Sequence, residues 1–403
     1  MKMQSSRIDG YSVPAPLEIG TLSKPALLGF FSGGRGRDLS AETKYGLFFD
    51  ALARRFDLLG VHDVDLSGYH RLMSGLLTFH PNRKIWKERY YKNIYSFNKR
   101  SHNAAHVQKN YEKQADLVLQ VGVLFDAYWD KLQIPNIIYT DWTSQLSAQN
   151  PYRYRSPFSG TKLAKWLNYE SKAFQHAIHI FTRSEVVRKN IVQEYGIPLE
   201  KVTTVGGGIN IYPFPEQPIL CQTDSPTLLF IGSDFKRKGG EVLLQAFSLV
   251  HNHVPSARLR LLTRDIIPDG LPLENVEVLP YVWDREMIYR LYKESDVFVL
   301  PSREETWGDV LLEAAAYGLP SIGVGGGVMD EVIKDGQTGF LTPLDDVGAL
   351  ANVMRVVLEN ADLRLQLGKD AKIHVKSNFT WDHVVERMAL KIESILSRKE
   401  QRL

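Results

Sequence analysis

The sequence predicts an α/β protein made of two doubly wound domains. Short apolar runs alternate with helical patterns along the chain, which is typical of parallel sheets covered by helices on both faces. The 403 residues are 44% hydrophobic, which is enough for two ordinary cores. Residues 205–226, "VGGGINIYPFPEQPILCQTDSP", are rich in proline and glycine and separate the runs into two sets. This stretch is the predicted hinge.

The apolar runs predict the strands of each domain in turn. Those of the first domain are 26–32, 56–61, 115–122, 136–140, 177–182 and 202–207. Those of the second are 227–232, 257–263, 276–282, 296–302, 320–326 and 339–343. Residues 1–24 are polar and interrupted by proline and glycine, which predicts a loose leader. We therefore divide the chain into this leader, an N-terminal domain at 25–208, a C-terminal domain at 209–375 and a helical segment at 376–403.

Composition limits the classes of partner and the compartment. Lys and Arg (49) nearly balance Asp and Glu (46), and the net charge of +3 is too small to indicate nucleic acid as the main partner. A single cysteine, Cys221, excludes an internal disulfide framework and fits a reducing compartment. The start of the chain lacks a signal-peptide pattern, and no apolar run approaches about 18 residues. We expect a cytoplasmic protein that does not span a membrane.

Two acidic residues in "PSREETWGDVLLEAAAYG", residues 301–318, predict a ligand site. Glu305 lies in the loop after a predicted strand, and Glu313 lies about one turn inside the next helix. Ligands of doubly wound sheets bind at such loops, and a helix start favours a phosphate. A carboxylate can hold a vicinal diol such as a ribose. One nucleotide-sugar would satisfy these features, whereas the alternative is an exposed Glu305 and a solvated Glu313.

Four segments of the chain together resemble one known family. They are "IFTRSEVVRKNI", "YGIPLEKVTTVGGGIN", "PSREETWGDVLLEAAAYGLPSI" and "GGGVMDEVIKDGQTGFLTP". In this order they resemble the family-four retaining glycosyltransferases (glycosyl transferases group 1), from about Lys24 onward and with one extra residue between Gly326 and Glu331. The resemblance implies the GT-B fold, in which two doubly wound Rossmann-like domains face each other across a cleft, with the last helices crossing back to the first domain. It also implies transfer from a nucleotide-diphosphate sugar to an acceptor hydroxyl without a cofactor or a metal.

The segment "LLFIGSDFKRKGGEVLLQAF" places three cations after a predicted strand. Fixed cations stabilise the negative charge that grows on a departing diphosphate. The resembled family carries Arg where this chain has Ser233, and its Lys corresponds to Lys238. Our hypothesis is that Arg237 reaches the diphosphate in place of the missing Arg. The alternative is that Lys236 and Arg237 are solvated surface charges.

The N-terminal half offers further candidates at strand ends. Gly33 and Gly34 follow the first strand, and the resemblance implies that the backbone there approaches the donor; the alternative is a tight turn that needs positive φ. Asp141 follows the strand at 136–140 and is expected either to contact the transferred sugar or the acceptor, or to cap a helix. Many family members carry His near this point, which this chain lacks.

The residue patterns and the resemblance together give two sets of expected site residues. The catalytic set is Lys238, Glu305 and Asp141. The donor-binding set is Arg237, Glu313, Trp307, Gly308, Gly33, Gly34, Ser233, Tyr281 and Val282, with the Trp307–Gly308 backbone on the sugar and Tyr281–Val282 near the base.

Two features lie outside these sets. His102 and His106 share a helix face, but no third ligand completes a metal site, so no metal is predicted. The stretch 83–113 holds nine Lys and Arg against two Glu, with an aromatic stripe through Trp86 and Phe97 at helical spacing. This basic stretch is expected to bind an anionic membrane, to grip a phosphorylated or lipid-linked acceptor, or to form an ordinary helix with a solvated face.

Two rival functions remain open at this point. A non-hydrolysing nucleotide-sugar epimerase shares the fold, although the cations together with the two acids argue against it. A non-catalytic sugar-binding module is the other, and the diphosphate loop argues against that one. The nucleotide base, the sugar and the acceptor are not specified by the sequence.

Overall fold

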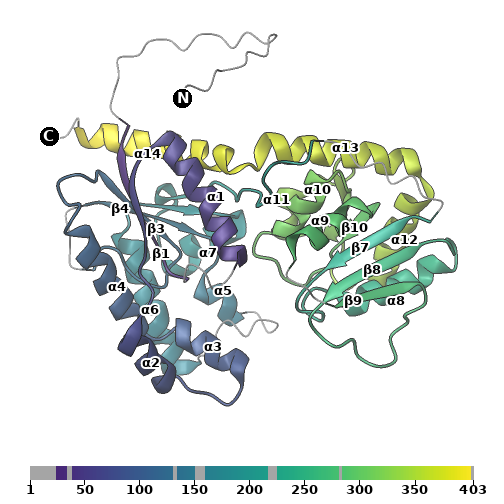
Figure 1. Ribbon diagram of the computed structural model, residues 1–403, viewed down its shortest axis with the longest axis horizontal. Coiled ribbons are helices and arrows are strands. Elements are labelled where there is room, and N and C mark those ends of the chain that lie inside the picture. The colour runs from purple at the N-terminus through teal and green to yellow at the C-terminus, as the bar shows by residue number, and fades with distance from the viewer. Residues whose placement is uncertain are drawn as a thin grey trace, which may run out of the picture.

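The computed structural model describes residues 24–33, 39–129, 134–149, 159–216, 225–280 and 284–400. Within these ranges, twelve strands form two sheets of six strands each, and all pairings are parallel (Figure 1). The strand orders are β2-β1-β3-β4-β5-β6 and β12-β11-β10-β7-β8-β9. In both sheets the order reverses beside the first strand of the domain, which defines a doubly wound sheet.

Each predicted run overlaps one strand of the structure, and the predicted fold class is confirmed. The first sheet consists of β1 (Ala26–Phe31), β2 (Asp57–Asp63), β3 (Leu117–Val121), β4 (Asn136–Thr140), β5 (His179–Thr182) and β6 (Val202–Thr204). The second consists of β7 (Thr227–Ile231), β8 (Arg258–Thr263), β9 (Val276–Pro280), β10 (Val297–Val299), β11 (Ser321–Val324) and β12 (Gly339–Thr342).

Helices connect the strands and cover both faces of each sheet (Figure 1). Those of the N-terminal domain are α1 (Leu39–Arg55), α2 (Gly68–Leu77), α3 (Arg83–Tyr91), α4 (Ile94–Gln108), α5 (Ser144–Gln149), α6 (Gly160–His176) and α7 (Glu185–Tyr195), followed by the 3₁₀ turn η1 (Leu199–Lys201). The later helices are α8 (Gly240–His251), α9 (Arg285–Lys293), α10 (Asp309–Ala316), α11 (Met329–Val332), α12 (Val347–Glu359), α13 (Ala361–Asn378) and α14 (Trp381–Glu400). Among the described residues, no helix has the length and apolar content to cross a bilayer.

The strands are apolar because they lie between two layers of helices. Every residue of β3, β4 and β7 is buried, whereas the edge strand β9 is largely exposed. Each domain has its own core, since the buried residues of the second sheet form one cluster and those of the first sheet form three others. Continuous apolar runs thus mark inner strands of a parallel sheet.

The chain crosses between the domains twice, and the two crossings lie side by side. The first is the stretch after β6, and the second is the junction between α13 and α14. The backbone N–H of Ile209 donates to the carbonyl of Phe379 at 2.7 Å, and Trp381 Nε1 donates to Asn210 Oδ1 at 3.1 Å. In Figure 1, α13 and α14 run along one side of the molecule, over the C-terminal and the N-terminal domain respectively.

The last helix, α14, packs on the N-terminal domain. Its buried Trp381 lies against Phe48 of α1, with ring centroids 5.0 Å apart, and both belong to the same core cluster. At the surface, Arg54 of α1 pairs with Asp382 at 2.7 Å. These contacts attach the end of the chain to the first domain.

Candidate functional site

Two strand-to-helix loops of the C-terminal domain form the candidate site. The basic loop, residues 233–239, follows β7, and the acidic loop, residues 301–308, follows the neighbouring strand β10. Arg303 donates its backbone N–H to the carbonyl of Arg237 at 2.9 Å and its Nη1 to the carbonyl of Lys236 at 2.6 Å. Because parallel neighbours end at the same edge of the sheet, the loops begin side by side, and these bonds fix them there.

The close approach of the two loops requires a glycine at position 239. Gly239 has a φ of +76°, and a Cβ placed on it would lie 1.9 Å from the carbonyl oxygen of Pro301. Any side chain would therefore collide with the backbone of the acidic loop, in a conformation that L residues rarely adopt. Gly239 also precedes the first residue of α8, so this contact positions the helix start.

The structure brings Lys238 and Glu305 together across the two loops. The Lys238 ammonium forms an ion pair with the Glu305 carboxylate, and the side chains are only 12% and 7% exposed. Burial opposes ionisation of Glu305, but attraction by Lys238 and Arg237 and hydrogen bonds from Lys238 and Ser302 outweigh it and lower its pKa. Glu305 is therefore a buried, ionised carboxylate, and the interpretation that it is exposed is wrong.

We expect the Glu305 carboxylate to make stability depend on acid pH. Because its pKa lies below the ordinary 4.5, its stabilising contribution is present above that value and is lost as the pH falls through the lowered pKa. Denaturant unfolding of the wild type and of Glu305→Gln, measured between pH 7 and pH 3, should show a difference in unfolding free energy that shrinks on acidification. A difference that grew toward pH 3 would contradict the lowered pKa.

Glu313, the second acid of the motif, is buried at the start of α10. Its carboxylate accepts hydrogen bonds from Arg285 Nη1 at 3.2 Å and from the Tyr292 hydroxyl at 3.1 Å, and its side chain is 7% exposed. Burial raises the pKa of Glu313, and the Arg285 charge only partly offsets this rise. Arg285 Nη2 also donates to the carbonyl of Asn210 in the linker, at 2.6 Å. The interpretation that Glu313 is a solvated helix residue is therefore wrong.

The start of α10 faces the N-terminal domain. Gly308, with a φ of +86°, precedes the helix, and the ring of Trp307 is buried against Phe379 at 5.9 Å. Asp309, the first helical residue, accepts a hydrogen bond at 2.7 Å from Nη2 of Arg183, whose side chain is 1% exposed. Since the ring of Trp307 lies in the interior, its backbone is the part suited to contact a ligand. Arg183 links the two domains at the same point.

Sequence reasoning missed Arg183 and Arg285. Arg183 directly follows β5, so the rule that singled out Asp141 after β4 would also have found it. Arg285 stands alone at the start of α9 and belongs to none of the motifs. Its link to Glu313 depends on the packing of α9 against α10, which no local pattern encodes.

The basic loop gives its other residues different surroundings. Arg237 Nη1 donates to the carbonyl of Glu304 at 2.7 Å, and Nε lies 3.5 Å from Asp234 Oδ2. The Arg237 side chain is only 15% exposed, so the interpretation of it as a solvated surface charge is wrong, whereas Lys236 is exposed. Ser233, which stands where the resembled family has Arg, is exposed directly after β7. A contact of Arg237 with a diphosphate stays a prediction.

In the N-terminal domain, Asp141 and Gly33 also lie at strand ends. Asp141 follows β4 and is half-buried, and its charge acts on the buried Arg183 that joins the domains. Gly33 follows β1, does not have a positive φ, and has open space where a Cβ would stand. A tight turn with positive φ is therefore excluded at Gly33. Gly34, Tyr281 and Val282 lie outside the described residues.

The basic stretch 83–113 does not form one helix with one aromatic stripe. It contains α3 and α4, separated where Asn93 caps the second helix by accepting from the backbone N–H of Ser96 at 2.9 Å. Phe97 is 1% exposed, and Trp86 donates its Nε1 to the carbonyl of Gly75 at 3.0 Å. The expected continuous stripe is wrong because the capping asparagine interrupts the helix and turns these aromatic rings toward the protein.

The two histidines of α4 remain at the surface. His102 and His106 are exposed, and the His102 ring lies against Trp129 with centroids 5.6 Å apart. No group of three His, Cys, Asp or Glu side chains suited to a metal ion occurs within the described ranges.

Comparison with known proteins assigns the second domain to a family. Residues 216–374 match the family model of the glycosyl transferases group 1. The D-inositol 3-phosphate glycosyltransferase of Streptomyces scabiei is 27% identical over 216 residues, which cover 48% of this chain and 48% of that protein. The chain thus spans about half the length of this relative. The predicted resemblance to this family is confirmed.

Solved structures extend the likeness to both domains. Sucrose-phosphate synthase from Thermosynechococcus elongatus has a TM-score of 0.63 at 18% identity, covering 93% of this chain and 100% of that chain. Anabaena HepE, solved in complex with UDP and glucose, has a TM-score of 0.61 at 17% identity, covering 92% and 100%. At such low identity the likeness shows the fold, and the predicted GT-B fold is confirmed.

Proposed function

From the match of residues 216–374 to the group 1 glycosyltransferases, we propose that the chain is a retaining glycosyltransferase. It moves a sugar from a nucleotide-diphosphate donor to an acceptor hydroxyl and keeps the anomeric configuration. The observation that carries the proposal is the buried pair of Lys238 and Glu305 between two strand-to-helix loops. Such a pair places a cation and an anion at the edge of the sheet where ligands of this fold class bind.

The C-terminal domain holds the donor in this proposal. Lys238, with Arg237 beside it, faces the diphosphate and stabilises the negative charge that grows as the bond to the sugar breaks. Glu313 accepts hydrogen bonds from the ribose hydroxyls, and its salt bridge to Arg285 keeps the carboxylate oriented. Glu305 and the backbone at Gly308 contact the sugar. No cofactor or metal takes part.

Retention follows in this proposal from attack on the same face that the diphosphate leaves. The departing phosphate oxygen then takes the proton of the acceptor hydroxyl, so that no dedicated protein base is needed. Asp141 orients the acceptor or the sugar from the opposite domain, next to Arg183. Proton NMR of the first-formed product tests whether the anomeric configuration is retained. An inverted anomeric centre would refute retention.

The N-terminal domain binds the acceptor, and closure about the hinge excludes water that would hydrolyse the donor. We place the enzyme in the cytoplasm, in glycolipid, polysaccharide or other glycoconjugate synthesis, with a glycan or a lipid-linked acceptor. The basic helices α3 and α4 support an anionic or membrane-attached acceptor because their cations lie on the acceptor domain. An epimerase would instead convert the donor with no acceptor present, which a product assay reveals.

Donor binding tests the role of Glu313 directly. We expect UDP, GDP or ADP to raise the melting temperature of the wild type, because a ligand that binds only the folded state stabilises it. Glu313→Gln should weaken binding of the preferred nucleotide by roughly tenfold, since a charge-assisted hydrogen bond to the ribose contributes about 1.5–3 kcal/mol. The control is Glu286→Gln, an exposed acid on α9. Equal affinities for the two variants would remove Glu313 from the donor site.

A further inference from the structure

Helix α2 has the reverse of the usual distribution of apolar residues. Its buried side is polar and small, with Ser74 fully buried and Thr78 following it one turn later. Its outer side carries large apolar residues, which continue into the next turn. These residues, which we call the apolar patch, are Tyr69, Leu72, Leu76, Leu77 and Phe79, with exposed fractions of 68%, 69%, 72%, 63% and 63%. Isolated exposed leucines are ordinary, but five large apolar residues within eleven positions form a patch that indicates an interaction site.

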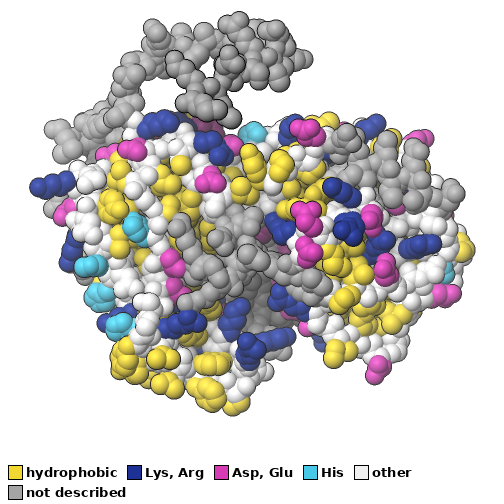
Figure 2. Space-filling view, in the orientation of Figure 1, with side chains coloured by type: hydrophobic (Ala, Val, Ile, Leu, Met, Phe, Trp, Pro, Cys, Tyr) yellow, Lys and Arg dark blue, Asp and Glu magenta, His cyan; other side chains and the backbone are white. Residues whose placement is uncertain are grey.

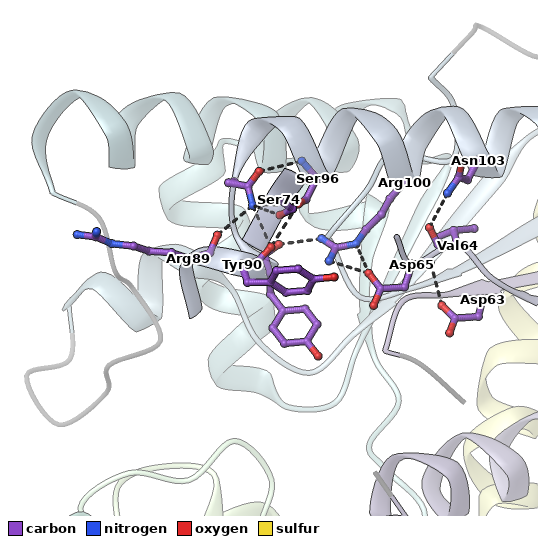
Figure 3. A network of polar contacts seen from close by, with 11 residues as sticks. Asp63, Val64, Asp65, Ser74, Arg89, Tyr90, Ser96, Arg100 and Asn103 are labelled. Atoms are coloured by element: carbon purple, nitrogen blue, oxygen red, sulfur yellow. Dashed lines mark hydrogen bonds and ion pairs between the residues drawn. The ribbon is translucent and has the colours of Figure 1, made fainter. Parts of the chain in front are cut away.

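A polar network fixes this orientation of α2 (Figure 3). The hydroxyl of Ser74 lies 2.7 Å from that of Ser96 on α4, and Asn93 Nδ2 donates to Ser74 at 3.3 Å. In the same network, the buried Arg100 of α4 donates its Nε to Asp65, in the loop before α2, at 2.9 Å. The bonds to Ser74 would break if the helix rotated to bury its leucines, so the apolar patch points outward as a property of the fold.

Cations lie beside the apolar patch (Figure 2), and acids are absent from its segment. Residues 66–87 contain no Asp or Glu, and their four Lys and Arg residues are all exposed. These residues, which we call the basic flank, are Arg71, Arg83, Lys84 and Lys87. Figure 2 shows hydrophobic side chains at this end of the N-terminal domain, with Lys and Arg side chains beside them.

We propose that the apolar patch and the basic flank together dock the protein on an anionic lipid bilayer. The leucines and aromatic rings enter the boundary between headgroups and acyl chains, and the cations of α3 stay among the headgroups. A second copy of this chain is a poorer occupant, because a symmetric dimer would bring one basic flank against the other. The charges of the basic flank favour an anionic partner with an apolar interior.

This surface deepens the proposed function and rests on it in one respect: a lipid-linked acceptor would lie in the same bilayer. Docking itself needs no donor and no turnover, so vesicle binding and nucleotide binding are separate measurements. The surface also replaces the aromatic stripe expected for residues 83–113, since Trp86 and Phe97 pack against the protein while α2 presents the apolar side chains.

Co-sedimentation with vesicles tests the proposal on the full chain. The vesicles are phosphatidylcholine with or without phosphatidylglycerol, at low and at high salt. We expect binding only with phosphatidylglycerol and weaker binding in salt, because salt screens the basic flank. The double substitution Leu72→Ser with Leu76→Ser should reduce vesicle affinity at least tenfold. Each leucine side chain that enters the bilayer contributes a factor of about ten or more to the affinity. Arg83→Glu with Lys84→Glu should have an effect of similar size.

Matched variants outside the surface serve as controls. Leu390→Ser replaces a leucine on α14 that is 64% exposed, and Lys369→Glu reverses an exposed lysine on α13. Both should bind vesicles like the wild type, and all variants should keep the wild-type affinity for whichever of UDP, GDP or ADP the wild type prefers. Failure of the wild type to sediment with anionic vesicles overturns the proposal, as does loss of binding in the control variants to the same degree. Self-association through α2, seen as a concentration-dependent mass that Leu72→Ser abolishes, also overturns it.

Discussion

Replacing Lys238 by methionine should lower the rate of sugar transfer by about 100-fold or more. Removing one preorganised electrostatic group from a transition state costs roughly that factor in turnover. The substitution keeps most of the length of the side chain and removes the charge, so that the loss of turnover reports the contribution of the cation. It should also destabilise the fold, because breaking a buried ion pair that leaves its partner uncompensated costs about 3–5 kcal/mol.

The partner left behind is Glu305, whose pKa is held down by Lys238. Without this attraction, burial becomes the dominant influence and the pKa of Glu305 rises. The unfolding free energy of Lys238→Met should therefore fall less on acidification than that of the wild type, because protonation of Glu305 no longer breaks an ion pair. The matched control is Lys236→Met in the same loop, where the side chain is exposed. If both variants kept wild-type turnover at saturating donor, Lys238 would have no part in the reaction.

Replacing Gly239 by alanine should separate the two loops of the candidate site. The added Cβ would lie 1.9 Å from the carbonyl oxygen of Pro301, and a backbone atom cannot yield as a flexible side chain does. The basic loop must shift away from the acidic loop, which stretches the pair between Lys238 and Glu305. We expect the unfolding free energy to fall by several kcal/mol, because steric strain and the loss of a buried ion pair add together. We also expect near-complete loss of turnover.

Gly270→Ala is the matched control for this substitution. Gly270 has a φ of +83°, close to the +76° of Gly239, but nothing lies within 4 Å of its virtual Cβ. Alanine there incurs only the strain of a left-handed backbone, about 1–2 kcal/mol, and should keep its activity. Thermal unfolding and turnover of the two variants separate backbone strain from collision. Similar losses in both would show that the contact with Pro301 is unimportant.

The fold could be predicted because its signal is local. Each inner strand is an uninterrupted apolar run such as "LVLQV" at 117–121, bounded by helical patterns, and the burial of the strands confirms the cause. The position of Glu305 in a loop and of Glu313 inside a helix followed from the glycine before α10 and from the helical periodicity after it. Placement relative to the nearest strand is therefore readable from the sequence.

The partners of these residues could not be predicted, because they come from distant parts of the chain. Glu313 is bound by Arg285, 28 positions away, and Asp309 by Arg183 of the other domain. The sequence also predicted one aromatic stripe within residues 83–113, which the structure divides between α3 and α4. Spacing alone joined Trp86 to Phe97, whereas the capping of α4 by Asn93 and the polar inner side of α2 turned those rings inward. Which side of a helix is buried depends on the elements that pack against it, and these come from tertiary structure rather than from local sequence.

The paired crossings between the domains restrict how the two halves can move. A single connecting segment would allow the domains to rotate and translate in any direction. Here two connecting segments are joined by hydrogen bonds at Ile209–Phe379 and Asn210–Trp381, so they define a hinge axis. Sliding or twisting would shear those bonds, whereas rotation about the line through them would not. We therefore expect the lobes to rotate about this line, and an opening rotation must separate Arg183 after β5 from Asp309 after β10.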